Sequence, residues 1–519
     1  MKRGRLPLAG VVAVTALLLA SSGGTHAIKE GGTFQVAFLT GRFDSIDPAL
    51  PGLPIAQRLL LPACGTLIAY PHKPPPAGYR LTPSLAEAAP VVSRNRQAYS
   101  FTIRKDARFS TGASVTALAF KHALQRILTP AMESSFAVAF EDILGARKML
   151  AGKATTLAGV AAKGRKLTIR LTKPVPDLLN SLAWLCAVLP NLPADPEGAE
   201  APLATAAPYH VAEYVPGERI VLERNRFYRG ERPHHVARFV VNLASDFGPG
   251  IDQVASATAD TFWPGPTPEQ TAELARRYGV NKSQFFVVPG NVLRVLVLND
   301  SRPLFRNNTK LRQAVNFAVD RRALVREAGP FIERPTDQYL LPGSPGLRDE
   351  RIYPLEGPDL PKARALAKGN LRSRKAVLYT IDIPSDVARA QILQRNLKAI
   401  GIELEIKQFP VTLYFEKIAT PGEPWDLARV QFTDLTDPVY LNFLFGDSLP
   451  PKYKQLLDRA SRLTGDERYR AYGELDVQIS RYIAPMIPVA AVSQQTFVSR
   501  RVGCIVLNPV LDLTAVCLK

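Results

Sequence analysis

The side chains best suited to bind a metal are four cysteines and six histidines, and their spacing gives no metal-binding pattern. No pair of cysteines has the short separation that zinc sites use, and no histidine follows His235. The adjacent residues His234 and His235 lie in a polar segment where neighbouring side chains point apart, so we expect a surface role for both. The sequence therefore predicts no metal site and no cofactor.

Disulfide bonds explain the cysteines better than zinc does. An even number of cysteines is typical of disulfide-bonded exported proteins. Cys504 and Cys517 bracket a short segment rich in turn and β-branched residues, which suits a bridge that closes a C-terminal loop. Cys64 and Cys186 then remain as a long-range pair. Zinc is the alternative, and the missing ligand spacing disfavours it.

Ser448 is a candidate nucleophile because residues 446–449 spell Gly-Asp-Ser-Leu, the sequence around the catalytic serine of one class of hydrolases. In those enzymes the motif lies near the N-terminus and the catalytic histidine follows far downstream. Here the motif comes late and no histidine follows it, so Ser448 has no base to activate it. Glycine-rich phosphate loops and zinc-protease motifs are also absent. We expect a protein that is not an enzyme.

The elements around these residues alternate between strand and helix patterns. The clearest unit begins with a buried strand at 376–381 and continues with a helix that Ser385 can cap. The helix ends at Gly401, and an alternating strand at 402–406 completes the unit. Two strands joined by one helix are expected to run parallel with a right-handed crossover. The fold class is therefore predicted to be α/β with mixed sheets.

The length of the chain indicates more than one lobe. A chain of 519 residues exceeds what one hydrophobic core usually supports. Residues 190–208 lack periodicity and are rich in proline and alanine, which indicates a boundary between lobes.

The first 27 residues have the pattern of a signal peptide. Lys2, Arg3 and Arg5 precede a short apolar run, and Ala27 ends an acceptable cleavage site. The run is too short and too interrupted for a membrane anchor, and no other segment is long enough to span a bilayer. No cysteine precedes Cys64, so the usual lipid-attachment site is missing. We expect a free, exported protein that does not span a membrane.

The chain is strongly basic, with a formal net charge of +19. Removal of the three basic residues of the signal peptide leaves 19 − 3 = +16. The lysines and arginines are scattered rather than gathered into a stripe or a basic helix, which argues against nucleic-acid binding. A preference for anionic surfaces and ligands remains as an explanation.

Several segments, in the right order, resemble the family 5 extracellular solute-binding proteins of ABC transporters, which include dipeptide- and oligopeptide-binding proteins. The most specific match is LTPSLAEAAPVVSRNRQAYSFTIRKDARFSTGASVTALAFKHAL at 81–124. Further matches are SIDPAL around Asp47, ERNRFYRGERP at 223–233, LRQAVNFAVDRRAL at 311–324 and FTDLTDPVYLNFLF at 432–445.

The resemblance implies a bilobal periplasmic-binding-protein fold with discontinuous domains and a hinged ligand cleft. Lobe I would combine residues 28–53, 201–298 and 486–519, with residues 54–200 inserted as a subdomain. Lobe II would comprise residues 299–485. Two crossovers, at 297–299 and 487–489, would form the hinge. The protein would be a periplasmic monomer that hands a small-molecule or peptide ligand to ABC transporter permease subunits.

The resemblance also implies ligand-binding residues. Asp434 corresponds to the aspartate that binds the ligand's amino group in peptide-binding relatives. The other expected ligand-binding residues are Phe432, Gln431, Asp47 and Trp425. Gln431 stands where peptide-binding members commonly have tryptophan, so the ligand is either a peptide or another amine-bearing compound. Nearby, Asp437 precedes Pro438, which is typical of a helix N-cap rather than a ligand site.

Two other functions remain open from the sequence. A secreted hydrolase would require a nucleophile with its base, and a periplasmic chaperone or scaffold would use the same fold without a sealed polar cleft. Ligand-dependent closure would distinguish a solute receptor from both.

Overall fold

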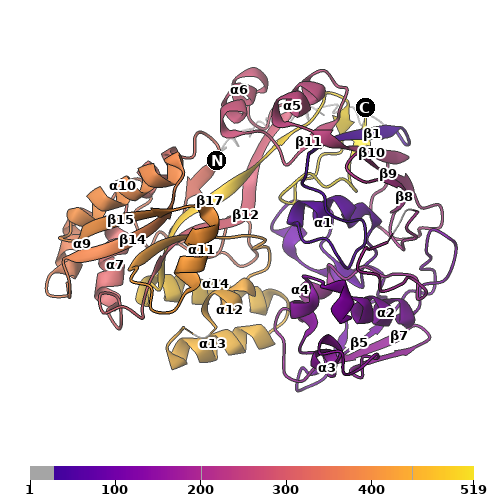
Figure 1. Ribbon diagram of the computed structural model, residues 1–519, viewed down its shortest axis with the longest axis horizontal. Coiled ribbons are helices and arrows are strands. Elements are labelled where there is room, and N and C mark those ends of the chain that lie inside the picture. Colours follow the sequence, from indigo (N-terminus) through magenta and orange to yellow (C-terminus); the bar gives the residue numbers. More distant parts are fainter. Residues whose placement is uncertain (1–27, 200–201, 447) are drawn as a thin grey trace, which may run out of the picture.

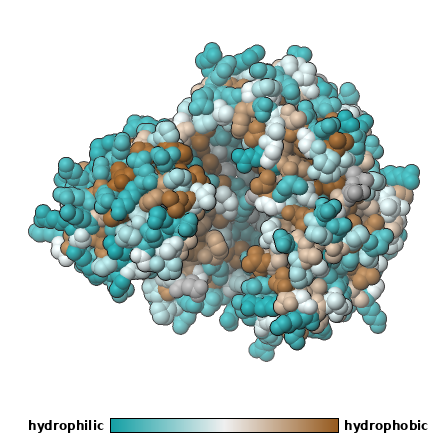
Figure 2. Space-filling model, in the orientation of Figure 1, coloured by the Kyte–Doolittle hydropathy of each residue, from teal (hydrophilic) through white to brown (hydrophobic). Residues whose placement is uncertain are grey.

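The structure is a computed structural model that describes residues 28–199, 202–446 and 448–519. The predicted signal peptide at 1–27 lies outside the described residues. The described chain forms two lobes that face each other across a central hollow (Figures 1 and 2).

A five-stranded mixed sheet forms the centre of the first lobe. Its strand order is β11-β1-β10-β9-β8, and β1 runs parallel to both β10 and β11. The strands are β1 (Thr33–Leu39), β8 (Tyr209–Val215), β9 (Arg219–Arg224), β10 (Arg238–Ser245) and β11 (Thr261–Trp263). Alternating buried residues of this sheet, including Phe34, Val36 and Phe38, build one hydrophobic core. Helices α5 (Phe247–Ala255) and α6 (Pro268–Tyr278) belong to the same lobe.

Between β1 and β8 the chain builds a separate subdomain with its own core. Its antiparallel sheet has the order β4-β5-β7-β6. The strands are β4 (Val91–Val92), β5 (Ala98–Thr102), β6 (Val160–Lys163) and β7 (Lys166–Arg170). Helix α2 (Ala117–Ile127) packs its buried face on this sheet. The remaining elements here are α1 (Pro54–Leu60), β2 (Ile68–Ala69), β3 (Thr82–Pro83), α3 (Ala146–Leu150) and α4 (Leu178–Leu182).

A six-stranded mixed sheet, with the order β13-β17-β12-β16-β14-β15, forms the second lobe. The strands are β12 (Phe285–Leu298), β13 (Glu333–Pro335), β14 (Lys375–Ile381), β15 (Glu403–Phe409), β16 (Leu427–Phe432) and β17 (Met486–Phe497). One core includes residues of α7 (Thr309–Ala318), α8 (Arg321–Arg326), α9 (Leu360–Ala367) and α10 (Pro384–Lys398). A second core includes residues of α12 (Tyr440–Phe445), α13 (Pro451–Arg462) and α14 (Gly465–Tyr482), while α11 (Val411–Ala419) contributes to a third.

The predicted strand-helix-strand unit is confirmed as β14-α10-β15. The two strands are parallel, with Leu378 opposite Ile406. The predicted cap is wrong, because the helix begins at Pro384 and Ser385 already lies in its first turn. Together the sheets confirm the α/β class with mixed sheets.

Strands β12 and β17 connect the lobes and pair with each other over nearly their whole length (Figure 1). Phe285 and Phe497, at one end of the pair, join the core under α5 and α6, whereas Leu296 and Ile487 join the core of the second lobe. The change of lobe therefore lies between Val287 and Leu293 in β12 and between Ala491 and Phe497 in β17, whereas the resemblance implied crossovers at 297–299 and 487–489. The difference arises because both strands continue far past the sheet of the first lobe.

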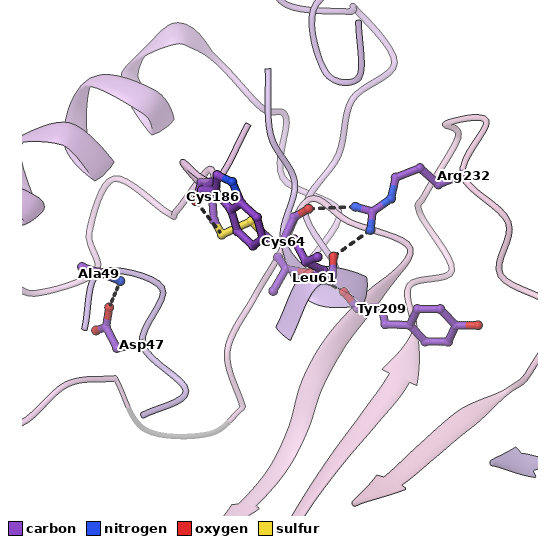
Figure 3. Close-up of a disulfide and its surroundings, with 9 residues drawn as sticks. Asp47, Ala49, Leu61, Cys64, Cys186, Tyr209 and Arg232 are labelled. Atoms are coloured by element: carbon purple, nitrogen blue, oxygen red, sulfur yellow. Dashed lines mark hydrogen bonds between the residues drawn. A yellow bond between two sulfur atoms is a disulfide. The ribbon is translucent and has the colours of Figure 1, made fainter. Parts of the chain in front are cut away.

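Both predicted disulfides are present. Cys64 is bonded to Cys186 and Cys504 is bonded to Cys517. The first joins the segment after α1 to the segment after α4, and Arg232 fixes its surroundings by donating to the carbonyl oxygens of Cys64 (2.8 Å) and Leu61 (2.7 Å) (Figure 3). The second links the short strands β18 (Val502–Gly503) and β19 (Cys517–Leu518).

Candidate functional site

A cleft runs between the lobes and contains four adjoining cavities. Each cavity has at least two of the same four residues in its wall: Arg58, Trp184, Asp434 and Thr436. The largest has a volume of about 740 Å³ and lies between α4 of the inserted subdomain and the segment that follows β16. Figure 2 shows this region as a deep hollow with apolar and polar surface in its walls.

The segment that follows β16 forms the second-lobe wall of the cleft. Gln431 and Phe432, two of the expected ligand-binding residues, are the last residues of β16, and both line the largest cavity. After Phe432 the chain leaves the sheet and presents Thr433, Asp434 and Thr436 to the same space. A strand end at a sheet edge is a common place for ligand-contacting side chains in α/β proteins.

Asp434 lies at the centre of the cleft, and its carboxylate joins the two lobes. Arg58 of α1 forms an ion pair with it, with 2.6 Å between Nη2 and Oδ1. The Asn291 side-chain amide donates to the same oxygen at 3.1 Å. The side chain of Asp434 is 43% exposed, so it stays accessible to a molecule in the cleft. Its φ of 60° is a left-handed conformation that few non-glycine residues adopt, and such strain often marks a functional site.

Aromatic and polar side chains of the inserted subdomain form the opposite wall. The Tyr70 hydroxyl accepts a hydrogen bond from Asn180 (2.8 Å) and contacts the Thr436 hydroxyl across the cleft (3.4 Å). Burial raises the pKa of Tyr70 well above its usual range, which keeps the hydroxyl protonated. Desolvation, together with the negative charge of Asp437, raises the pKa of Asp177 in the same wall.

Asp437 also touches the largest cavity, but its carboxylate is held within the lobe. Arg468 of α14 donates to both of its oxygens, at 2.7 and 2.9 Å. Oδ1 also accepts the backbone N–H of Val439, one residue before α12 begins. Asp437 therefore shapes the entry to α12, close to the capping role that the sequence predicts, and anchors α14 in addition.

Asp47 does not lie in the cleft. Its side chain is fully buried, and Arg126 of α2 donates to both carboxylate oxygens at 2.9 and 2.5 Å. The backbone N–H of Ala49 also donates to Oδ1 (Figure 3). With both oxygens bonded inside the protein, Asp47 fastens the segment after β1 to the inserted subdomain, and we remove it from the candidate site.

Trp425 lies just before β16, whereas Asp434 follows the other end of that strand. Its side chain packs on the small cluster of Tyr379, Ile381 and Tyr414, under α11. It lines none of the four cavities. We therefore remove Trp425 from the candidate site as well.

The candidate nucleophile and the two adjacent histidines that the sequence singled out are bonded to nearby groups of the protein. The Ser448 hydroxyl donates to the backbone carbonyl oxygen of Phe445, in a turn after α12. His235 pairs with Glu30, and Nδ1 of His234 lies 2.9 Å from the carbonyl oxygen of Arg232. Within the described residues, no three histidine, cysteine or acidic side chains lie together as a metal site would need.

Sequence reasoning missed the first-lobe half of the cleft. Arg58, Tyr70 and Trp184 line it, yet they lie far from residue 431 along the chain. The only signal at Arg58 is a lone charge within the apolar run PIAQRLLLPA. Such a charge is equally typical of a solvent-facing helix position, so the pattern could not identify it.

Comparisons with known proteins agree on one family. The model of the family described as bacterial extracellular solute-binding proteins, family 5 (middle) matches residues 80–448, well over half of the chain. The oligopeptide-binding protein OppA of Bacillus subtilis is 22% identical over 413 residues, which cover 73% of this chain and 74% of that protein. The dipeptide-binding protein DppE of the same organism is 23% identical over 447 residues, which cover 81% of this chain and 80% of that protein.

A solved structure shows the same fold. The murein tripeptide-binding protein MppA, in its unliganded open form, superposes with a TM-score of 0.81 at 19% identity. The match covers 95% of this chain and 98% of that one. By their names, the family and these relatives are binding proteins rather than enzymes. None of the helices in the described part of the chain has both the length and the apolar character that a bilayer-crossing helix needs.

Proposed function

We propose that this chain, which belongs to the bacterial extracellular solute-binding proteins of family 5, captures a small solute between its lobes for an ABC uptake transporter. The solute is a peptide or another amine-bearing compound. The protein closes around it by a hinge motion and presents it to the permease subunits. It acts in the periplasm as a monomer and is not an enzyme.

The observation that carries the proposal is the position of the Asp434 carboxylate. It follows a central strand of one lobe, faces the cleft and is accessible there. A carboxylate in that position binds an ammonium group through a short, charge-assisted hydrogen bond. Closure of the lobes would remove water from the pair and strengthen the electrostatic attraction.

The strand pair β12-β17 supports a hinge. Its pairing register shifts between Pro289 and Val292, which is a local irregularity where a strand bends more easily. Gly290 lies at this irregularity, and a Cβ atom there would lie 2.4 Å from the carbonyl oxygen of Val492. Only glycine allows the two strands to approach so closely, so we place the bending point at this residue.

The two disulfides support export to an oxidising compartment, because such bonds persist there and are rare in the cytosol. Together with the signal-peptide pattern of residues 1–27, they favour the periplasm.

The proposal is tested on Asp434. Native mass spectrometry of gently purified protein weighs the bound compound, which then serves for calorimetric titration. If closure buries the ion pair between the ligand's ammonium and Asp434, the Asp434→Ala variant should bind the compound roughly 10²–10³-fold or more weakly, because the ligand's charge is left unpaired. Asp252→Ala, on the exposed face of α5, is the matched control and should bind normally. Unchanged affinity in folded Asp434→Ala would remove Asp434 from the site. A scattering profile that does not contract with ligand would argue against hinge closure.

A further inference from the structure

We infer that the ligand carries a free α-amino acid head group, whose ammonium binds Asp434 and whose carboxylate binds Arg58. This inference rests on the proposed function and narrows the amine-bearing ligands to one chemical class. Two opposite charges, one from each lobe, meet in the cleft where the ligand is expected.

Arg58 depends on Asp434 for its charge balance. Among the described residues, Asp434 is the single carboxylate with which Arg58 forms an ion pair. The Arg58 side chain is only 12% exposed, so water compensates little of its charge. An arginine cannot lose its proton to avoid this situation. A ligand ammonium that takes Asp434 from Arg58 therefore leaves a poorly hydrated guanidinium without a partner, which is strongly unfavourable.

A ligand that brings an anion of its own resolves this conflict. An α-amino acid has its ammonium and carboxylate on the same carbon, so it fits between two side chains that otherwise touch each other. The guanidinium fork matches a carboxylate in two-point contact. The amide of Asn291 remains bonded to Oδ1 of Asp434, which fixes the carboxylate for the incoming ammonium.

An ordinary peptide satisfies only the Asp434 half of this arrangement. The carbonyl next to its N-terminal ammonium belongs to an amide and carries no charge, so it offers Arg58 no counter-charge. A simple amine fails for the same reason. The cavity of about 740 Å³ beside Asp434 leaves room for a substantial tail on the amino acid, against Phe432 and Trp184.

The test uses matched sets of three probes. Nε-acetyl-L-lysine, L-citrulline and γ-L-glutamyl-anilide each have a free α-amino acid head on a neutral tail. Each is compared with its α-carboxamide and with its decarboxylated amine by calorimetry and thermal shift. With the unmodified protein we expect at least one acid to bind, and to bind roughly 10–100-fold more tightly than its two partners.

Variants separate this inference from the proposed function. Arg58→Gln should remove the preference for the acid while it keeps the requirement for the ammonium. Asp434→Asn should weaken binding of acid, carboxamide and amine alike. Far-UV circular dichroism and the mass of the intact disulfide-bonded chain check that both variants fold.

Three results would overturn the inference. The first is equal binding of the acids and their carboxamides. The second is a preference for the acid that persists in Arg58→Gln. The third is tighter binding of peptides than of every acid, which includes the case in which no acid binds. If the carboxylate proves irrelevant but Asp434→Asn still abolishes amine binding, the proposed function stands and only the head-group assignment fails.

Discussion

Some charged residues lie in the cleft and others are buried in the core, and the residues that they contact show which is which. Asp434 and Asp47 both lie in segments that resemble the family, yet one faces the cleft with 43% exposure and the other is fully buried against Arg126. Arg126 comes 79 residues after Asp47, so no local pattern reveals the pair. The resemblance pointed to Asp434, Gln431 and Phe432, which adjoin one strand end and together line the cleft. It could not separate an aspartate that is buried in an ion pair from one that faces the cleft.

A substitution at Asp47 measures the structural role. Asp47→Ala leaves Arg126 buried without its counter-charge, and we expect the free energy of unfolding to fall by about 3–5 kcal/mol. Urea denaturation checks this value. The double variant Asp47→Ala/Arg126→Met removes both charges and should recover part of the loss. Ligand affinity should be unchanged in the folded single variant, and a loss of affinity without a loss of stability would return Asp47 to the binding site.

At the scale of elements, local patterns predict what local contacts determine. The β14-α10-β15 unit follows from alternating residues and a glycine stop, all within about one supersecondary unit. The length of β12 and β17 cannot be predicted from local patterns. Their pairing joins residues about 200 positions apart and carries both strands from one lobe into the other. The docking of α14 is similarly non-local, since Asp476 on this helix binds the backbone of Tyr339 at 2.9 Å.

Asp476 makes the docking of α14 depend on pH. Burial raises the pKa of Asp476 to about 7, although hydrogen bonds from Tyr339 and Gln338 oppose the shift. The folded pKa lies above the unfolded value, so the folded state holds the proton more tightly. Stability is therefore full below about pH 4 for this group and falls as the pH rises towards 7, by on the order of 4 kcal/mol. Denaturant unfolding from pH 4 to 8 should show this fall in the natural protein and not in Asp476→Asn. Parallel pH profiles for the two would contradict it.

For the molecule as a whole, the two lobes are predictable in number but not in their exact division. Length indicates more than one lobe, and the cysteine count indicates bridges. The proline-rich stretch at 190–208, predicted to be a boundary between lobes, instead lies between the inserted subdomain and β8 of the first-lobe sheet. The meeting of Arg58 with Asp434, which builds the cleft, depends on how complete lobes face each other. That arrangement is set by strands β12 and β17 and by contacts such as Arg80 with Asp466, and none of these is encoded in a short segment.

The disulfides act at this largest scale, and their loop lengths predict unequal effects. The Cys64–Cys186 bond spans 122 residues and encloses nearly the whole inserted subdomain, whereas Cys504–Cys517 spans 13. In the chain-entropy model the longer loop contributes about 5 kcal/mol and the shorter about 3 kcal/mol, because the longer bridge restricts more of the unfolded chain.

We therefore expect Cys64→Ala/Cys186→Ala to lower the urea midpoint of the inserted subdomain more than Cys504→Ala/Cys517→Ala does. Tryptophan fluorescence suits the measurement because Trp184 lies next to the longer bridge. Cys64 also lines the cleft beside Arg58, so loss of the longer bond should weaken ligand binding, while loss of the shorter bond should not. Equal shifts in stability, or a larger shift for the C-terminal pair, would show that strain or contacts in the folded state outweigh chain entropy here.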